Sequence, residues 1–346
     1  MDVRLALTGF GNVGQGVAHL LAGRGEEYEN RYGIRLLLTG VADRGGAAVD
    51  AAGLNPDSLI AAKKDHQSVA HHEHGEAGLQ GQAFLEAAGA GVLIEAASTN
   101  FDDAEPGWSY VRSALSLDMD VVLASKGALV LHFKELMADA RERGKRVMFA
   151  GTVGAPVPVL ELAGTVLVGS TIEAVEGILN GTTNQILTSM EEGASYEDGV
   201  RRAQELGIAE TDPTLDVDGW DAGAKAVIIA NAVFGADLAL DDVTREGIRG
   251  VTADDLAKAR REGNSIRLIA RVERHGEEVR ASVGPMTRDA GETLGRLRND
   301  QMGVVFRTDV LGLVSSTVEA AGGVPTALTV LRDVFNLASQ RGWRER

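Results

Sequence analysis

One short stretch in the second half of the chain combines residue types that can transfer a proton. Asp221 and Lys225 are four residues apart within a helical pattern, so their side chains lie on one helix face and can pair. An ammonium group held in this way can give a proton or positive charge to the oxygen of a carbonyl that accepts hydride, and the carboxylate would keep it charged. Taken alone, the pair also fits an exposed helical salt bridge, which is the commoner use of this spacing.

An acidic loop precedes this helical pattern. It carries Glu210 and Asp216, and Pro213 and Gly219 restrict its shape. A loop this acidic cannot be buried without a cation, and the α-amino group of an amino-acid substrate is such a cation. A solvated acidic face is the alternative. The restricted shape favours a substrate loop.

A glycine-rich turn near the amino terminus has the spacing of a dinucleotide-binding turn. It follows an apolar run and opens a helical pattern, and its residues are Gly9, Phe10, Gly11, Asn12, Val13 and Gly14. Gly9 would make the turn, Gly11 would let the backbone approach a pyrophosphate, and Gly14 would let the helix pack on the strand. The amino end of the helix would offer free N–H groups to the phosphates. A loop without a ligand is the alternative, but strand, turn, helix and next strand occur in the order that favours NAD or NADP.

Two neighbouring residues at the end of the second strand pattern point to different cofactors. Asp43 would accept hydrogen bonds from the ribose 2′-hydroxyl of NAD, whereas Arg44 would pair with the 2′-phosphate of NADP. An ordinary turn explains two such residues equally well. The sequence therefore leaves the choice between NAD and NADP open. For the nearby Lys63 and Lys64 we expect a solvated helix end.

The elements that must position these residues alternate in type along the first 150 positions. Strand-like apolar runs occur at residues 3–7, 34–42, 92–96, 121–124 and 147–150, with helical stretches between them. Such alternation predicts right-handed βαβ units and a parallel, Rossmann-type sheet, while helices followed by strands after Gly151 predict an α+β domain. We thus expect an α/β protein with an NAD(P)-binding domain over 1–150 and a substrate-binding, catalytic and dimerisation domain over 151–310. A C-terminal segment over 311–346 would pack back on the cofactor domain.

Composition narrows the partners. A formal charge of −16 argues against nucleic acid, because phosphate binding needs clustered Lys and Arg, and the absence of cysteine excludes disulfides and thiolate chemistry. No signal-peptide pattern and no apolar run of membrane-spanning length is present, so we expect a cytoplasmic protein with a small-molecule substrate and no membrane partner. The strand-rich section over 264–308 has no obvious catalytic residue, and its strands could pair across a two-fold axis. A homodimer is the expected assembly.

Several segments together resemble the homoserine dehydrogenase family. They are residues 177–184 (GILNGTTN), 206–221 (LGIAETDPTLDVDGWD) with Lys225, 124–127 (ASKG) and 322–327 (GGVPTA), besides the amino-terminal turn. The resemblance covers nearly the whole chain and stops short of a regulatory or fused kinase domain. It implies NAD(P)-dependent interconversion of L-aspartate 4-semialdehyde and L-homoserine, in threonine, methionine and isoleucine biosynthesis.

The resemblance also implies roles for individual residues. Glu210 and Asp216 would contact the substrate, and Lys225, held by Asp221, would be the acid/base residue. Lys126, in the loop after the strand pattern 121–124, would reach the substrate or the nicotinamide, so the choice of proton donor stays open between the two lysines. The implied cofactor contacts are Gly9, Phe10, Gly11, Asn12, Val13, Gly14, Asp43, Arg44, Ser98, Thr99, Lys126 and Gly322.

Two segments depart from the family pattern. Members can bind a monovalent cation, Na or K, through backbone carbonyls, and Val153, Ala155 and Val157 match those positions. Yet Ala150 stands where some members carry a Glu ligand, and carbonyls alone make a weak site, which leaves the cation open. Residues 318–323 have fewer glycines than usual, so their packing on the cofactor is open as well.

Other interpretations remain beside this one. The histidines of the polar segment 66–81, which reads as a surface loop, have a spacing that suits no standard zinc motif: His71, His72 and His74. A different Rossmann-fold amino-acid or semialdehyde dehydrogenase is the nearest rival in function, and a non-catalytic NAD(P)-binding regulator is a rival of another class. The joint presence of the acidic loop and the Asp221–Lys225 pair counts against the regulator, which needs no proton donor.

Overall fold

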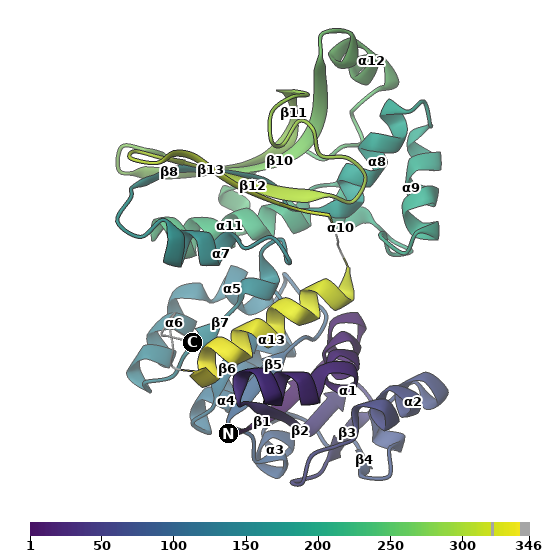
Figure 1. Ribbon diagram of the computed structural model, residues 1–346, viewed down its shortest axis with the longest axis vertical. Helices are drawn as coiled ribbons and strands as arrows, with labels where there is room; N and C mark the ends of the chain where they lie inside the picture. Colours follow the sequence, from purple (N-terminus) through teal and green to yellow (C-terminus); the bar gives the residue numbers. More distant parts are fainter. Residues whose placement is uncertain (320–321, 340–346) are drawn as a thin grey trace. The chain divides into compact units, whose positions relative to one another are not determined.

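The computed structural model describes residues 1–319 and 322–339, and the chain divides into two compact units (Figure 1). Among the described residues, one unit comprises Met1–Thr152 together with Gly323–Ser339, and the other comprises the part of the chain between them. The chain thus leaves the second unit at Gly322, later than position 310, because residues 312–318 form an edge strand of the second sheet. Ala320 and Ala321 of the expected glycine-poor segment lie outside the described residues.

The first unit is built on a seven-stranded sheet in the order β4-β3-β2-β1-β5-β6-β7. The strands are β1 (Asp2–Thr8), β2 (Arg35–Asp43), β3 (Gly46–Val49), β4 (Gly75–Ala77), β5 (Val92–Glu95), β6 (Asp120–Leu123) and β7 (Val147–Met148). Neighbours from β2 through β1, β5 and β6 to β7 run parallel, whereas β3 and β4 pair antiparallel at one edge. The central strands are apolar because helices bury both of their faces. The predicted Rossmann-type parallel sheet is confirmed.

Helices complete the first unit, and the last of them comes from the far end of the chain. They are α1 (Asn12–Tyr32), α2 (Pro56–His66), α3 (Gly81–Ala88), α4 (Gly107–Ser116), α5 (Gly127–Leu131), α6 (Phe133–Glu142) and α13 (Gly323–Ser339). In Figure 1 the yellow α13 lies beside the purple α1, and both contribute apolar side chains to one core. Gly16 permits this approach, since a Cβ there would lie 2.9 Å from the Ala327 Cβ. Residues 323–339 therefore belong to the same compact unit as the glycine turn.

The second unit contains a six-stranded sheet in the order β13-β12-β8-β10-β11-β9. Its strands are β8 (Ile172–Ile178), β9 (Thr244–Arg245), β10 (Asn264–His275), β11 (Glu278–Asp289), β12 (Met302–Thr308) and β13 (Gly312–Val318), and its helices are α7 (Val159–Glu161), α8 (Gly181–Glu191), α9 (Tyr196–Glu205), α10 (Thr214–Val217), α11 (Trp220–Phe234) and α12 (Ala253–Arg261). Helix α11 contacts β10 and β11. Most of its own residues are buried, and they are mainly small or branched apolar residues. The mixed helix and strand content confirms the α+β expectation.

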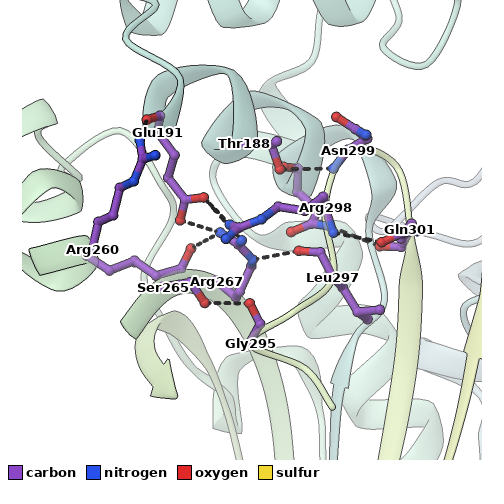
Figure 2. Close-up of polar contacts among 12 residues, drawn as sticks. Thr188, Glu191, Arg260, Ser265, Arg267, Gly295, Leu297, Arg298, Asn299 and Gln301 are labelled. Atoms are coloured by element: carbon purple, nitrogen blue, oxygen red, sulfur yellow. Dashed lines mark hydrogen bonds and ion pairs between the residues drawn. The ribbon is translucent and has the colours of Figure 1, made fainter. Parts of the chain in front are cut away.

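A buried ion pair joins three elements of this unit (Figure 2). Arg267 on β10 is fully buried, and its guanidinium donates to both carboxylate oxygens of Glu191 on α8, at 2.7 and 3.2 Å. Its Nε donates to the Leu297 carbonyl at 3.0 Å, in the segment that leads into β12. Arg298 from the same segment also pairs with Glu191 but is much more exposed. The pair therefore fixes the amino-terminal part of β10 against the end of α8.

The segment over 66–81 is more ordered than a surface loop. It contains a short 3-10 turn at Val69–His71 and the strand β4, and His72 within it is buried. The His72 ring uses its nitrogens internally, because Nε2 lies 2.7 Å from the Ser58 hydroxyl and Nδ1 accepts from the His74 amide at 3.1 Å. No group of three metal-ligating side chains occurs among the residues described, and no helix there is long and apolar enough to cross a membrane.

Candidate active site

Asp221 and Lys225 lie one turn apart at the beginning of α11. The Lys225 ammonium donates to Asp221 Oδ2 at 2.5 Å and to the Leu179 carbonyl, just beyond β8, at 2.6 Å. The two side chains are only 16% and 12% exposed, respectively. The pair is therefore partly buried and engages a second element, unlike an exposed helical salt bridge.

Asn180 brings a second carboxylate to this pair. Its side-chain NH₂ group donates to Asp216 Oδ1 at 2.6 Å and to Asp221 Oδ2 at 2.8 Å, while its Oδ1 accepts from the Thr183 amide at the start of α8. These partners fix the orientation of the amide, since carboxylates only accept and a backbone N–H only donates. Asn180 thus links the end of β8 to α10 and α11.

The environment of Asp216 makes its ionisation harder than that of an exposed aspartate. Burial is the main reason that the pKa of Asp216 is raised, and the neighbouring Asp221 carboxylate raises it further. The hydrogen bond from Asn180 and the Lys225 ammonium act in the opposite direction without reversing the shift. Two carboxylates share one lysine here, so the group carries an excess negative charge when both are ionised. Such a group can bind a cation beside a proton donor.

Asn180 was not among the residues expected in the site. The signal lay in the GILNGTTN segment, because an Asn that caps a helix with its carbonyl oxygen keeps an NH₂ group for other partners. Glu210, by contrast, is exposed, and only its backbone carbonyl takes part in a described hydrogen bond, from Gln204. The structure places Asp216, Asp221 and Lys225 together and leaves the Glu210 side chain outside their hydrogen bonds.

The glycine turn joins β1 to α1 in the way that its spacing predicts. Gly9 has φ +84°, and a Cβ there would lie 2.3 Å from the Ala96 backbone, while a Cβ on Gly14 would lie 2.3 Å from the Gly9 carbonyl. Nothing lies within 4 Å of a Cβ built on Gly11, so that backbone faces open space. Phe10 is buried in the core and can offer a ligand only its backbone. The turn has the close packing at Gly9 and Gly14 and the open side at Gly11 that a pyrophosphate requires.

The other turn and loop residues expected at the cofactor lie near the same sheet edge. Asn12 and Val13 open α1, and a Cβ on Gly323 would lie 3.0 Å from the Asn12 carbonyl, so the chain after the exposed Gly322 passes close to the turn. Ser98 is exposed in the loop after β5. Thr99 in that loop accepts a hydrogen bond from the Lys126 amide, in the loop after β6, at 3.2 Å. Carboxyl ends of neighbouring parallel strands meet here, as in open α/β sheets that bind nucleotides.

Asp43 at the end of β2 is held by four donors. Its Oδ1 accepts from the Gly45 amide and the Ser68 hydroxyl, and its Oδ2 accepts from the Lys63 ammonium at 2.8 Å and the Val69 amide. Burial alone would raise the pKa of Asp43, but the hydrogen bonds, that of Lys63 foremost, outweigh it and lower the pKa. The expectation of a solvated helix end is thus wrong for Lys63, whose partner lies on another element.

Arg44 next to it is exposed. Its backbone carbonyl accepts from Gln80 Nε2 at 2.9 Å, and this bond anchors the turn that carries the side chain. The guanidinium is thus presented to solvent at the same corner as Asp43. The two residues expected to contact the cofactor, Asp43 and Arg44, therefore lie next to each other at the end of β2.

The expected cation positions form a tight turn at the start of the second unit. Val153, Ala155 and Val157 have buried side chains, and the Val157 amide donates to the Gly154 carbonyl at 2.9 Å. Ala150 before them donates its amide to Asp333 on α13. Only backbone oxygens of the three positions are of use to a cation.

Comparisons with known proteins identify the family of the chain. The family model described as homoserine dehydrogenase matches residues 158–335, and the model described as the homoserine dehydrogenase NAD binding domain matches residues 9–150. The NAD(+)-dependent homoserine dehydrogenase of Pseudomonas canavaninivorans is 36% identical over 338 residues, covering 97% of this chain and 96% of that protein. The homoserine dehydrogenase of Methanocaldococcus jannaschii is 31% identical, with 97% and 98% covered.

Solved structures give the same answer. A putative homoserine dehydrogenase from Archaeoglobus fulgidus superposes with a TM-score of 0.86 at 34% identity, covering 97% of this chain and 99% of that one. A hyperthermophilic archaeal homoserine dehydrogenase in complex with NADPH superposes with a TM-score of 0.83 at 26% identity, covering 99% of each chain. The chain therefore belongs to the homoserine dehydrogenase family and is an NAD(P)-dependent oxidoreductase that acts on a CH–OH group.

Proposed function

We propose that Asp216, Asp221 and Lys225 form the substrate site of this enzyme, with L-aspartate 4-semialdehyde and L-homoserine as the pair interconverted. The observation that carries the proposal is the partly buried Lys225 ammonium, held by Asp221 at 2.5 Å and by the Leu179 carbonyl at 2.6 Å. An ammonium has three N–H donors, and these two contacts use two of them. The third can donate to the aldehyde oxygen, and Asp221 keeps the group charged until the proton is transferred.

Asp216 is the proposed partner of the substrate's α-ammonium group. With Asp216 and Asp221 ionised and Lys225 protonated, the group has a net charge of about −1, which one substrate ammonium would neutralise. The raised pKa of Asp216 also fits a cation at this site. Burial beside Asp221 disfavours a second negative charge, and a bound substrate ammonium would remove that penalty. Glu210 is exposed before binding, so a contact with substrate would require its side chain to turn inward.

The cofactor would be held by the glycine turn of the first unit. The open side of Gly11 and the amino end of α1 suit its pyrophosphate, and the bound nicotinamide supplies or accepts the hydride. Lys126 and Thr99 stand at the ends of β6 and β5 in the same sheet, where we place contacts to the nicotinamide side. The backbone carbonyls of Val153, Ala155 and Val157 are the proposed ligands of a Na or K ion.

We further propose that the enzyme works in the cytoplasm as a homodimer, in threonine, methionine and isoleucine biosynthesis. One face of the second sheet supports the dimer. There Glu176 on β8 pairs with Arg288 on β11 at 2.8 Å and with Arg271 on β10 at 3.5 Å, and Arg271 also pairs with Glu273. A face with both charges interspersed can meet a copy of itself across a two-fold axis. Light scattering should give twice the chain mass, and the chain mass alone would contradict the dimer.

A cofactor-absorbance assay tests the activity and the assignment together. Aspartate 4-semialdehyde is offered with NADH and with NADPH, and turnover with at least one is expected. Lys225→Met should lower kcat by about 100-fold or more, as for other positioned proton donors, with little change in cofactor KM. The exposed Lys258→Met on α12 is the control and should leave both constants unchanged. An unaltered kcat in Lys225→Met would move the proton donor to Lys126.

A further inference from the structure

A buried carboxyl group lies beside the cofactor loops and has no part in the proposed chemistry. Glu95 is the last residue of β5 and is fully buried. Its Oε1 accepts from the Ala97 amide at 2.8 Å, and its Oε2 accepts a short hydrogen bond from the Ser125 hydroxyl. Burial raises the pKa of Glu95 to about 7, and these two hydrogen bonds only partly oppose the shift. A carboxyl group in such a place is costly, since an apolar residue would fill the position without losing hydration.

The contacts of Glu95 join two loops that are far apart in the sequence. Ala97 belongs to the loop after β5, and Ser125 belongs to the loop after β6, its neighbour in the parallel sheet. The Glu95 backbone carbonyl also accepts from the Ala124 amide at 2.7 Å. Both the backbone and the side chain of this one residue therefore hold the second loop.

Two further contacts tie these loops together. The Lys126 amide donates to Thr99 Oγ1 at 3.2 Å, and a Cβ on Gly127 would lie 2.6 Å from the Asn100 carbonyl. Ser125, which donates to the Glu95 carboxyl, directly precedes Lys126, whose amide donates to the Thr99 hydroxyl. A shift of the Ser125 side chain would thus move the backbone of Lys126.

A third element closes around the carboxyl group. A Cβ on Gly107, the first residue of α4, would lie 3.1 Å from the Glu95 carboxyl carbon. A Cβ at this distance would be tighter than an ordinary van der Waals contact, so glycine favours the close approach, and the amino end of a helix favours a nearby negative charge. The carboxyl group is therefore enclosed by α4 and both loops and has little freedom to move.

We propose that Glu95 is a positioning residue, which through Ser125 and Ala97 sets the backbone that presents Lys126 and Thr99 to the nicotinamide cofactor. This inference rests on the role given to Lys126 in the proposed function. Its physical basis is that a residue locked by buried hydrogen bonds holds its neighbours within the small tolerance that hydride transfer needs.

The test compares variants of the whole enzyme. Ser125→Ala removes the hydroxyl, Ser125→Thr keeps it, and Glu95→Gln keeps the shape of the side chain without its charge. For Ser125→Ala and Glu95→Gln we expect a roughly tenfold or greater loss in kcat/KM, as for removal of a hydrogen bond to a charged group. Ser125→Thr should restore most of the activity. Thr39→Val, which deletes another buried hydroxyl in the same sheet, is the control and should leave the kinetics unchanged.

Epistasis separates positioning from general destabilisation. In a Lys126→Met background, Ser125→Ala should cause little further loss, because its effect passes through Lys126. Binding of NADH without substrate, followed by cofactor fluorescence, gives a readout that stands even if the wild-type enzyme does not turn over aspartate 4-semialdehyde. Absence of wild-type turnover would refute the proposed function alone. Unchanged kcat/KM and NADH affinity in Ser125→Ala, or an equal loss with and without Lys126, would overturn the positioning role.

Discussion

Glu191→Gln should be among the most damaging single changes in the second unit. The substitution keeps the size of the side chain but removes the charge that faces Arg267, a fully buried guanidinium. Breaking a buried pair from one side costs about 3–5 kcal/mol, because the other charge stays buried without a partner. Arg267 keeps its bonds to the Leu297 and Ile266 carbonyls. The lower end, ~3 kcal/mol, is therefore expected.

Urea unfolding followed by tryptophan fluorescence measures this cost, since Trp220 reports on the second unit. With a slope of about 2 kcal/mol per molar urea, the midpoint of that unit's transition should fall by about 1.5 M. Arg298→Met is the matched control: it removes the other arginine of Glu191, which is 42% exposed, and should cost under about 1 kcal/mol. The double variant Glu191→Met with Arg267→Met should recover most of the loss. Equal costs for Glu191→Gln and Arg298→Met would refute the argument from burial.

Three further changes follow from single contacts. Burial raises the pKa of Asp333 from 3.8 to about 6, so the folded state binds this proton more tightly than the unfolded state, and stability should fall as pH rises from 4 to 6. In Asp333→Asn this loss of unfolding free energy, at most about 3 kcal/mol, should disappear. Melting temperatures measured across pH 4–7.5 should therefore fall less steeply with pH than in the wild type, and an unchanged slope would contradict the role of Asp333. Arg44→Ala should raise the KM for NADPH about tenfold and that for NADH under about twofold, whereas equal effects would remove Arg44 from the 2′-phosphate. Asn180→Ser keeps a helix-capping oxygen but has only one donor for two carboxylates, so kcat should fall roughly tenfold. The control Ser195→Ala removes the capping side chain of α9 and should leave kcat unchanged. A normal kcat in Asn180→Ser would refute the bridging role.

The sequence predicted the parallel strands well because burial on both faces makes them continuous apolar runs. The ends of strands β1, β5 and β6 agree to within a residue or two with those of the expected runs 3–7, 92–96 and 121–124. It did not predict β3 and β4, which are short, rich in Gly and Ala, and paired antiparallel at an edge. Their existence depends on partners in the sheet rather than on their own pattern.

The same division holds for the candidate site. The Asp221–Lys225 pair could be read from spacing, because both residues lie on one helix and their contact is local. The bond from Asn180 to Asp221 spans 41 positions of the chain, and no local pattern encodes it. Glu210 is a different case: its substrate contact stays a prediction, because the position of an exposed loop side chain depends on the ligand.

The charge of the chain makes the local design of the cofactor site more important. A protein with a formal charge of −16 repels an anionic dinucleotide at long range, so its overall field cannot attract NAD or NADP. Attraction must come from groups within a Debye length of the phosphates, where the amino end of α1 and Arg44 can act. Lys63 adds less than its charge suggests, because Asp43 binds it directly and largely neutralises it. The four donors on Asp43 then have a second consequence: a carboxylate with both oxygens already engaged has little capacity left for a ribose hydroxyl. We therefore expect discrimination between NAD and NADP at this corner to depend on whether the cofactor can displace Lys63 or Ser68 from Asp43, and not on the presence of the acidic residue alone.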